Sequence, residues 1–355
     1  MCMWFKNREK APIAAEASAN MKDSSNVLEI DDLKVHFFTD DGVVKAVDGI
    51  SLDIPKNTTV GIVGESGCGK SVTSMSIMRL LQEPPASIVG GEIRLNLGDD
   101  ALDLAKMNKD SMRRIRGKEV AMIFQEPMTS LNPVFTIGEQ LMEGILVHRP
   151  DIGNAELKGK VIELLKMVGI SRSEEIVKSY PHELSGGMKQ RVVIAMALSC
   201  EPRLIIADEP TTALDVTIQA QVLELMRELK DRIHTSIMLI THDLGVVAEM
   251  AEMVVVMYAG RIVEQGTVYE IFENPLHPYT RGLMKARPTK DNKSKRLYSI
   301  EGNVPSPVGL PDYCYFHNRC EESEEDCKNE YPTLVSVTPT HKVSCYVANK
   351  ENKNA

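Results

Sequence analysis

The feature of this sequence that most constrains the fold is a glycine-rich segment between an apolar run and an amphipathic stretch. The segment Gly64–Ser71 reads Gly-Glu-Ser-Gly-Cys-Gly-Lys-Ser and directly follows the apolar run Val60–Val63. The apolar run predicts a short buried strand, and the spacing of apolar residues over Ser71–Leu81 predicts a helix. Between a strand and a helix, such a segment predicts a loop whose backbone N–H groups and helix dipole bind phosphate. Lys70 is then expected to contact the β- and γ-phosphates of a nucleotide, and Ser71 to bind Mg2+.

A second apolar run follows Arg203 and ends in two adjacent carboxylates, Asp208 and Glu209. A parallel strand would carry both side chains to the edge of the sheet where the phosphates lie. Asp208 is expected to bind Mg2+, mostly through water, and Glu209 to polarise an attacking water. An Asp-Glu pair at a strand end is often only a solvated pair. Together with the glycine-rich loop, it predicts nucleotide hydrolysis.

Strand-like and helical segments alternate along most of the chain, which predicts an α/β fold with a mostly parallel sheet. Helical periodicity dominates residues 135–200, so we expect a helical subdomain inserted there. Residues 1–26 show little periodicity and predict a flexible leader. The expected organisation is therefore a leader at 1–26, a main domain at 27–287 and a C-terminal extension at 288–355.

The composition excludes several classes of function. The 355 residues carry a formal net charge of -9, whereas a nucleic-acid-binding protein normally shows a basic excess. No stretch approaches the roughly 18 consecutive apolar residues that predict a membrane span. The first residues also lack the continuous apolar core of a secretory signal. We therefore expect no nucleic-acid partner and a cytoplasmic protein whose membrane contact is made through a partner.

A third motif is the segment Leu184–Gln190, which reads Leu-Ser-Gly-Gly-Met-Lys-Gln and precedes a predicted helix. Ser185 has the chemistry of a helix cap, and Gly186 and Gly187 leave room for another backbone to approach closely. A second helix N-terminus aimed at phosphate is one interpretation. A plain capped helix after a loop is the other, and physical reasoning alone leaves both open.

The order of these motifs resembles that of the ABC ATPases, in which Leu-Ser-Gly-Gly lies between the phosphate loop and the Asp-Glu strand. Three further residues resemble elements of that family in the expected order. Gln125, in Ile-Phe-Gln-Glu-Pro, is similar to the Q-loop glutamine that contacts Mg2+ and the attacking water. Asp215, in Thr-Ala-Leu-Asp, is similar to the D-loop aspartate. His242, in Ile-Thr-His-Asp, is similar to the switch histidine that contacts the γ-phosphate.

The resemblance covers about residues 27–287 and implies a complete ATPase site. It implies a P-loop NTPase core with a mostly parallel sheet, an antiparallel β subdomain and a helical subdomain. It implies that Glu209, His242 and Gln125 are catalytic, and that Mg2+ is held by Ser71, Gln125 and Asp208. The ATP-binding residues that it implies are Gly64, Glu65, Ser66, Gly67, Cys68, Gly69, Lys70, Ser71 and Val72.

The adenine ring of ATP in this family commonly stacks on an aromatic residue that precedes the phosphate loop. The candidates here are Phe37 and Phe38. Phe37 shares a strand face with Leu33 and Val35, so it could instead belong to the core. The resemblance favours Phe37, with Phe38 second.

Three local stretches resemble the oligopeptide/dipeptide (peptide/nickel) importers within the ABC family. They are the residues from Gln125 to Pro133, from Asn274 to Thr280 and from Phe316 to Cys320. The Glu-Pro-Met-Thr form after Gln125 resembles the first, D-type, of the two ATPase subunits in such importers. This implies a peripheral protein at the cytoplasmic membrane face, which powers import of peptides, or alternatively of nickel or another small solute.

The same resemblance implies partner proteins. They are a second, related ATPase subunit, two membrane permeases and an extracytoplasmic substrate-binding protein. In such a heterodimer, ATP lies between one chain's phosphate loop and the other chain's signature. Ser185, Gly186 and Gly187 would therefore contact the ATP held by the partner.

Four cysteines gather in the C-terminal extension: Cys314, Cys320, Cys327 and Cys345. In a cytosolic protein this density suggests a metal site more than disulfides, and four thiolates can hold Zn2+ or an iron–sulfur cluster. The spacing lacks the Cys-x2-Cys pairs of common zinc ribbons. Four unrelated reduced cysteines are the alternative. The importer resemblance extends over this region and implies a [4Fe–4S] cluster in preference to zinc.

Two other functions compete with transport. A non-transport ABC ATPase of translation or DNA repair would usually carry two fused cassettes or a long coiled coil, and this chain shows one phosphate loop and no sustained heptads. If the chain were a regulatory metal-sensing module, we would expect damaged ATPase motifs. Every motif is intact. The sequence therefore favours a transport ATPase.

Overall fold

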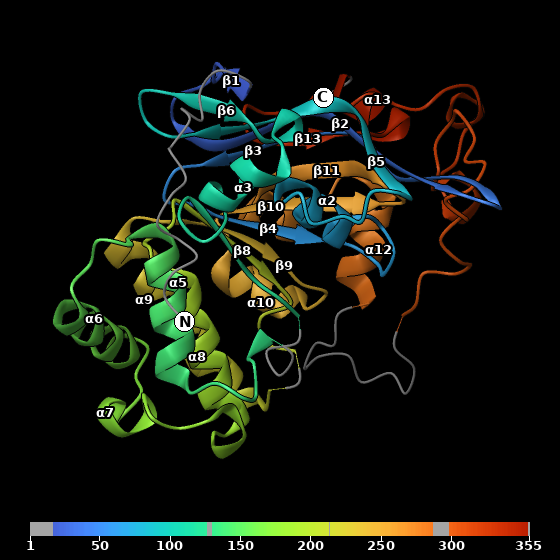
Figure 1. Ribbon diagram of the computed structural model, residues 1–355. Helices are drawn as coiled ribbons and strands as arrows, with labels where there is room; N and C mark the ends of the chain where they lie inside the picture. Colours follow the sequence, from blue (N-terminus) through green and yellow to red (C-terminus); the bar gives the residue numbers. More distant parts are fainter. Residues whose placement is uncertain (1–16, 126–129, 213, 287–297, 354–355) are drawn as a thin grey trace.

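The structure is a computed structural model that describes residues 17–125, 130–212, 214–286 and 298–353. Within these residues the larger of two β-sheets has eight strands, in the order β12-β13-β11-β10-β4-β9-β8-β7 (Figure 1). Its parallel part consists of β7 (Val120–Ile123), β8 (Leu204–Asp208), β9 (Ser236–Ile240), β4 (Thr59–Val63) and β10 (Met253–Tyr258). Antiparallel strands extend one edge, namely β11 (Arg261–Thr267), β13 (Lys342–Val343) and β12 (Val335–Ser336).

The order of the parallel strands positions the functional loops. Strands β4, β8 and β9 consist entirely of buried residues, as expected for a parallel sheet covered on both faces. Strand β9 pairs with β4 on one side and with β8 on the other. The segments that follow Val63, Asp208 and Ile240 therefore meet at one edge of the sheet.

A second, antiparallel sheet packs against the first. Its strands are β1 (Ser18–Ala19), β6 (Ala101–Asp103), β5 (Ala86–Asn96), β2 (Asn26–Thr39) and β3 (Gly42–Pro55). Ile30 and Ile50 of this sheet share one apolar core with Ile62 and Met238 of the larger sheet. Helices α2 (Lys70–Ile77) and α3 (Lys109–Ile115) and the 3-10 turn η1 (Leu104–Lys106) also contribute to that core.

The middle of the chain forms a helical lobe to one side of the sheets (Figure 1). It comprises α5 (Ile137–His148), α6 (Asn154–Met167), α7 (Ser173–Ile176), η2 (Pro181–Glu183) and α8 (Gly186–Leu198). Thr136 and Glu139 form a capping box that starts α5. Leu141, Leu164 and Val192 bury their side chains in a core that continues to Ile205 of β8. Helices therefore lie where the sequence predicts the helical subdomain.

The remaining helices are α9 (Val216–Ile233), α10 (Leu244–Met250), α11 (Val268–Glu273), α12 (Pro278–Ala286) and α13 (Tyr346–Lys353), with 3-10 turns η3 (His317–Arg319) and η4 (Glu325–Lys328). Within the described part of the chain, none of the helices has the length and apolarity needed to cross a bilayer.

The expected domain limits differ in part from the structure. The leader was placed at 1–26, but Ser18–Ala19 pair with β6, so ordered structure begins before Val27. A two-residue strand has no periodicity that a sequence could reveal. The expected boundary at 287/288 and residues 126–129, which carry the D-type resemblance, lie outside the described residues.

The C-terminal extension shares both sheet and core with the rest of the fold. Its strand β13 pairs with β11, and Val308 forms a β-bridge with Val44. Tyr315 and Phe316 are buried in one apolar cluster with Tyr258 of β10. The extension therefore packs on the main domain as part of one continuous structure.

Candidate nucleotide-binding site

The glycine-rich loop connects β4 to α2, as the sequence predicts. Gly64 and Gly69 have φ values of 153° and 101°, which L side chains rarely adopt. A Cβ atom on Gly64 would lie 2.2 Å from the Met257 carbonyl oxygen, and one on Gly69 would lie 2.5 Å from that of Ala46. Only glycine fits these two positions, because neighbouring backbone closes on the loop. The loop thus has the tight cradle that a phosphate group requires.

Lys70 begins helix α2 and turns its ammonium group back into the loop. Its Nζ donates hydrogen bonds to the carbonyl oxygens of Gly64, at 2.7 Å, and Glu65, at 2.9 Å. The residue is 8% exposed. A buried cation inside a backbone cradle at a helix N-terminus is suited to bind a polyphosphate.

Ser71, in the first turn of α2, forms a hydrogen bond with Asp208 at the carboxyl end of β8. Burial raises the pKa of Asp208 above its usual value, although a hydrogen bond with Ser71 works in the opposite direction. A divalent cation would favour the charged carboxylate, and it prefers oxygen ligands of these two kinds. The pair therefore fits the Mg2+ site that the sequence predicts.

The Glu209 carboxylate is the meeting point of three predicted elements. His242 Nδ1 lies 3.0 Å from Oε1, and Gln125 Nε2 donates to Oε2 at 3.1 Å. Thr212 Oγ1 donates to the same Oε2 at 2.9 Å. Burial would raise the pKa of Glu209, but the hydrogen bonds with His242 and Thr212 outweigh it, so the pKa is lowered. The carboxylate is held ionised, the state in which it can accept a proton or polarise water.

The backbone of Glu209 was not anticipated from the sequence. Its φ is 49°, in the left-handed region that a glutamate rarely occupies. Its N–H donates to the carbonyl oxygen of Ile240 at 2.8 Å, which ties the residue to the end of β9. Such strained residues concentrate at functional sites. The hydrogen bond from Thr212 was also missed: the D-loop resemblance includes this threonine but assigns no role to its hydroxyl.

The Leu-Ser-Gly-Gly segment starts helix α8, with Ser185 as its N-cap. Ser185 Oγ accepts a hydrogen bond from the Met188 N–H at 3.4 Å. Ser185 and Gly186 are exposed, and a Cβ atom on Gly186 would meet nothing within 4 Å. Farther along α8, the buried Gln190 donates to the Pro210 carbonyl oxygen at 2.6 Å. One end of this helix thus faces outward, and its first turns are bonded to the segment that carries Glu209.

Asp215 caps helix α9, where its Oδ1 accepts a hydrogen bond from the Ile218 N–H at 3.0 Å. The Ile218 side chain fills the space beside Gly187, since a Cβ atom there would lie 2.9 Å from it. The predicted D-loop and signature segments are therefore neighbours in the fold.

The two adenine candidates differ in burial. Phe37 is partly buried and packs against the core that both sheets share. Phe38 is 53% exposed, which leaves its ring available to a ligand. The core interpretation that the strand alternation suggested for Phe37 agrees with this packing.

The four C-terminal cysteines form one group. Cys327 and Cys345 are buried, and Cys314 and Cys320 are half-buried. Burial, reinforced by the neighbouring thiols, raises the pKa of Cys314 to about 12 and that of Cys320 to about 11. In the described residues, however, no three His, Cys, Asp or Glu side chains are arranged to hold a metal ion. The thiols are nevertheless near enough to one another for their charges to raise each other's pKa.

Comparisons with known proteins identify the family to which the chain belongs. A family model described as "ABC transporter" matches residues 47–212, and one described as "Oligopeptide/dipeptide transporter, C-terminal region" matches residues 263–327. The oligopeptide transport ATP-binding protein AppD of Bacillus subtilis is 51% identical over 92% of this chain and 98% of its own length. The dipeptide transport ATP-binding protein DppD of the same organism is 47% identical over 93% and 97%.

A solved structure has the same fold. It is the dimeric structure of a bacterial ABC transporter cassette, with a TM-score of 0.60 and 25% identity over 68% of this chain and 98% of that one. The fold match covers most of that cassette but leaves about a third of this chain unmatched.

Proposed function

Since the chain belongs to the ATP-binding subunits of oligopeptide/dipeptide ABC transporters, we propose that it binds and hydrolyses ATP to power the import of peptides. The observation that carries this function is the Glu209 carboxylate, which His242, Gln125 and Thr212 hold beside the phosphate loop. An ATPase needs positioning and charge neutralisation more than covalent chemistry. Glu209 and the residues that hold it supply the positioning. Lys70 supplies part of the charge neutralisation.

The residues have separate roles in this proposal. Lys70 and the loop Gly64–Ser71 bind the phosphates, while Glu209 orients and polarises the attacking water. His242 holds the Glu209 carboxylate and contacts the γ-phosphate. Ser71, Gln125 and Asp208 would hold Mg2+, which neutralises phosphate charge when it is bound. Phe38 is the better candidate for stacking on adenine, because Phe37 is packed against the core.

The exposed signature end of α8 supports a two-chain active site. Ser185 and Gly186 are exposed at the N-terminus of α8, where they are accessible to a nucleotide held by another chain. We therefore propose that this subunit pairs with a second, related ATPase subunit, and that Ser185, Gly186 and Gly187 contact the ATP held by that partner. Two permeases and a substrate-binding protein complete the proposed importer, with this chain at the cytoplasmic membrane face.

The proposed cofactor of the extension is a [4Fe–4S] cluster held by Cys314, Cys320, Cys327 and Cys345. The grouping of four thiols supports a metal group, and the sequence spacing of the cysteines lacks the Cys-x2-Cys pairs of common zinc ribbons. Four cysteine thiolates are the usual ligands of a [4Fe–4S] cluster. Anaerobic purification should give brown protein containing iron; colourless protein loaded with zinc would overturn the assignment.

Reconstitution tests the function as a whole. The chain is purified with its partner subunits in proteoliposomes, and uptake of a labelled peptide is measured with and without ATP. We expect ATP-dependent uptake that competing unlabelled peptides reduce. Uptake of nickel or another small solute, with no response to peptides, would favour the second candidate substrate class.

A further inference from the structure

A residue of the C-terminal extension reaches directly to the phosphate-binding loop. Arg319 Nη1 donates to Glu65 Oε2 at 2.9 Å, and its Nη2 donates to Glu65 Oε1 at 3.1 Å. Glu65 is the second residue of the loop, and Arg319 lies 254 positions later in the sequence. Two parallel hydrogen bonds between a guanidinium and a carboxylate fix both direction and distance.

The guanidinium of Arg319 has little freedom to move. Its side chain is 6% exposed. Beyond Glu65, it donates to the Tyr258 hydroxyl at 3.3 Å and to the carbonyl oxygens of Glu301, at 2.9 Å, and Ile300, at 3.4 Å. It also lies near the ring of Phe316, with 5.8 Å to the centroid. An arginine held at this many points can position the group it binds.

Glu65 is in turn bound by three groups. Its carboxylate receives Arg319, and its N–H donates to the Tyr279 hydroxyl at 2.9 Å. Its carbonyl oxygen accepts a hydrogen bond from Lys70 Nζ at 2.9 Å. The start of the loop is therefore clamped between Lys70 on the inside and two residues from the C-terminal part of the chain on the outside.

We propose that Arg319 is a positioning residue for ATP binding, because it fixes Glu65 and thereby the shape of the phosphate-binding loop. The extension is then part of the nucleotide site, although it contributes no catalytic group. Arg319 directly precedes Cys320 in the sequence. The inference rests on the proposed ATP site and does not depend on whether the cysteines bind a metal.

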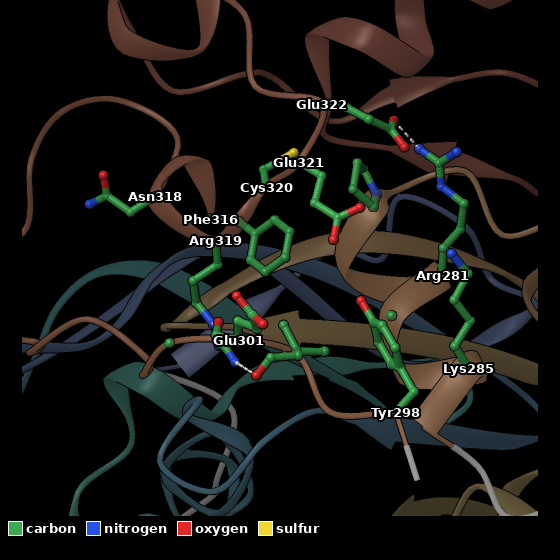
Figure 2. A pocket seen from close by; sticks show the side chains of 14 residues that line it. Arg281, Lys285, Tyr298, Glu301, Phe316, Asn318, Arg319, Cys320, Glu321 and Glu322 are labelled. Carbon is green, nitrogen blue, oxygen red and sulfur yellow. Dashed lines mark hydrogen bonds and ion pairs between the residues drawn. The ribbon is translucent and has the colours of Figure 1, made fainter. Parts of the chain in front are cut away.

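The alternative is that the ion pair only attaches the extension to the main domain. A nearby ion pair provides a control that distinguishes these two interpretations. Figure 2 shows a pocket of about 390 Å3 whose lining includes Arg319 and Cys320, together with Arg281 and Glu322, which form another ion pair. Arg281 joins α12 to the extension, just as Arg319 joins the extension to the phosphate loop. Among the described residues, however, Arg281 shows no hydrogen bond to the phosphate loop. Arg281→Gln is therefore a matched control.

Nucleotide affinity tests the proposal. Binding of a fluorescent ATP analogue is titrated on the full chain with its partner subunits, in a Glu209→Gln background that prevents hydrolysis. Arg319→Gln and Glu65→Gln should each weaken binding on the order of 10-fold, since small displacements of a binding group are costly. Arg319→Lys cannot make the bidentate contact, so its affinity for the analogue should lie between those of the parent protein and Arg319→Gln. The double variant should be no weaker than either single variant, because both remove the same contact.

The outcomes separate the two proposals. If the parent protein does not bind the analogue, the ATP site itself is wrong. If the parent binds and the Arg319 and Glu65 variants bind within about twofold of it, as Arg281→Gln should, only the positioning role is overturned. A fall in melting temperature without a change in affinity has the same meaning. Should Arg319→Gln not fold, Arg319→Lys and Glu65→Gln still decide, because both keep a polar side chain in place.

Discussion

His242 Nδ1 lies 3.0 Å from Glu209 Oε1 and so connects the end of β9 to the end of β8 across the sheet edge. This contact is one of two hydrogen-bond causes that lower the pKa of the carboxylate against the effect of burial. In the proposed ATPase site, the histidine would therefore help to keep the carboxylate of Glu209 charged.

His242→Ala should lower ATP turnover by about 100-fold, within the range typical of acid–base groups. It should also move the acidic limb of the pH profile of kcat to higher pH. The sign follows because the lowered pKa keeps Glu209 charged until the pH falls through it, and loss of the hydrogen bond raises that pKa. A steady-state pH series measures both effects. A fall in kcat with an unmoved acidic limb would refute the role of His242 in charging Glu209.

Two glycines of the phosphate loop should respond differently to alanine. Gly69→Ala should abolish ATP binding, because its Cβ would lie 2.5 Å from a backbone oxygen and φ is 101°. Gly67 has a φ of 78°, but a Cβ atom there meets nothing within 4 Å, so Gly67→Ala should pay only conformational strain of about 1–2 kcal/mol. Titration with an ATP analogue compares the two. Equal losses would show that close backbone packing does not shape the loop.

His277 makes stability depend on pH. It is 2% exposed, and burial lowers its pKa from 6.5 to about 4, with Glu264 opposing and Arg281 reinforcing the shift. Its stabilising contribution is present above pH 6.5 and is lost as the pH falls toward 4, by about 3 kcal/mol in all. Urea unfolding between pH 7 and pH 4 should show this slope, and His277→Gln should reduce it. An unchanged slope in His277→Gln would contradict this role of His277.

Cysteine replacement tests the extension. Cys345→Ser should remove most of the iron from anaerobically purified protein, because a cluster with four cysteine ligands would lose one of them. Cys200→Ser is the control, since Cys200 lies on the helical lobe, outside the group of four. Iron content and the visible spectrum measure the effect. Unchanged iron in Cys345→Ser would exclude Cys345 as a ligand.

The sequence predicts most of the elements that build the site. The apolar runs before Gly64 and Asp208 predict β4 and β8, which the structure places on either side of β9 in the parallel part of the larger sheet. Motif order and the family resemblance predict that Lys70, Gln125, Glu209 and His242 lie at one edge. Local patterns suffice here because each motif sits directly at the end of a strand.

Other features depend on contacts between distant segments, which local patterns do not encode. Glu209 combines a left-handed φ with a hydrogen bond to Ile240, and the Arg319–Glu65 pair joins residues 254 positions apart. The choice between Phe37 and Phe38 likewise depends on which ring the second sheet buries. The expected metal group also stays a prediction, because within the described residues no three potential ligands are arranged to hold a metal ion.

Peptide uptake by the reconstituted transporter, compared between the parent chain and Glu209→Gln, tests most directly whether ATP hydrolysis by this chain powers import. The variant keeps the phosphate loop, so it should bind ATP and remain in the closed, ATP-bound complex. Its ATP-driven uptake should fall at least 100-fold. Uptake by Glu209→Gln at the rate of the parent chain would contradict the assignment of Glu209 and the coupling of its ATPase to transport.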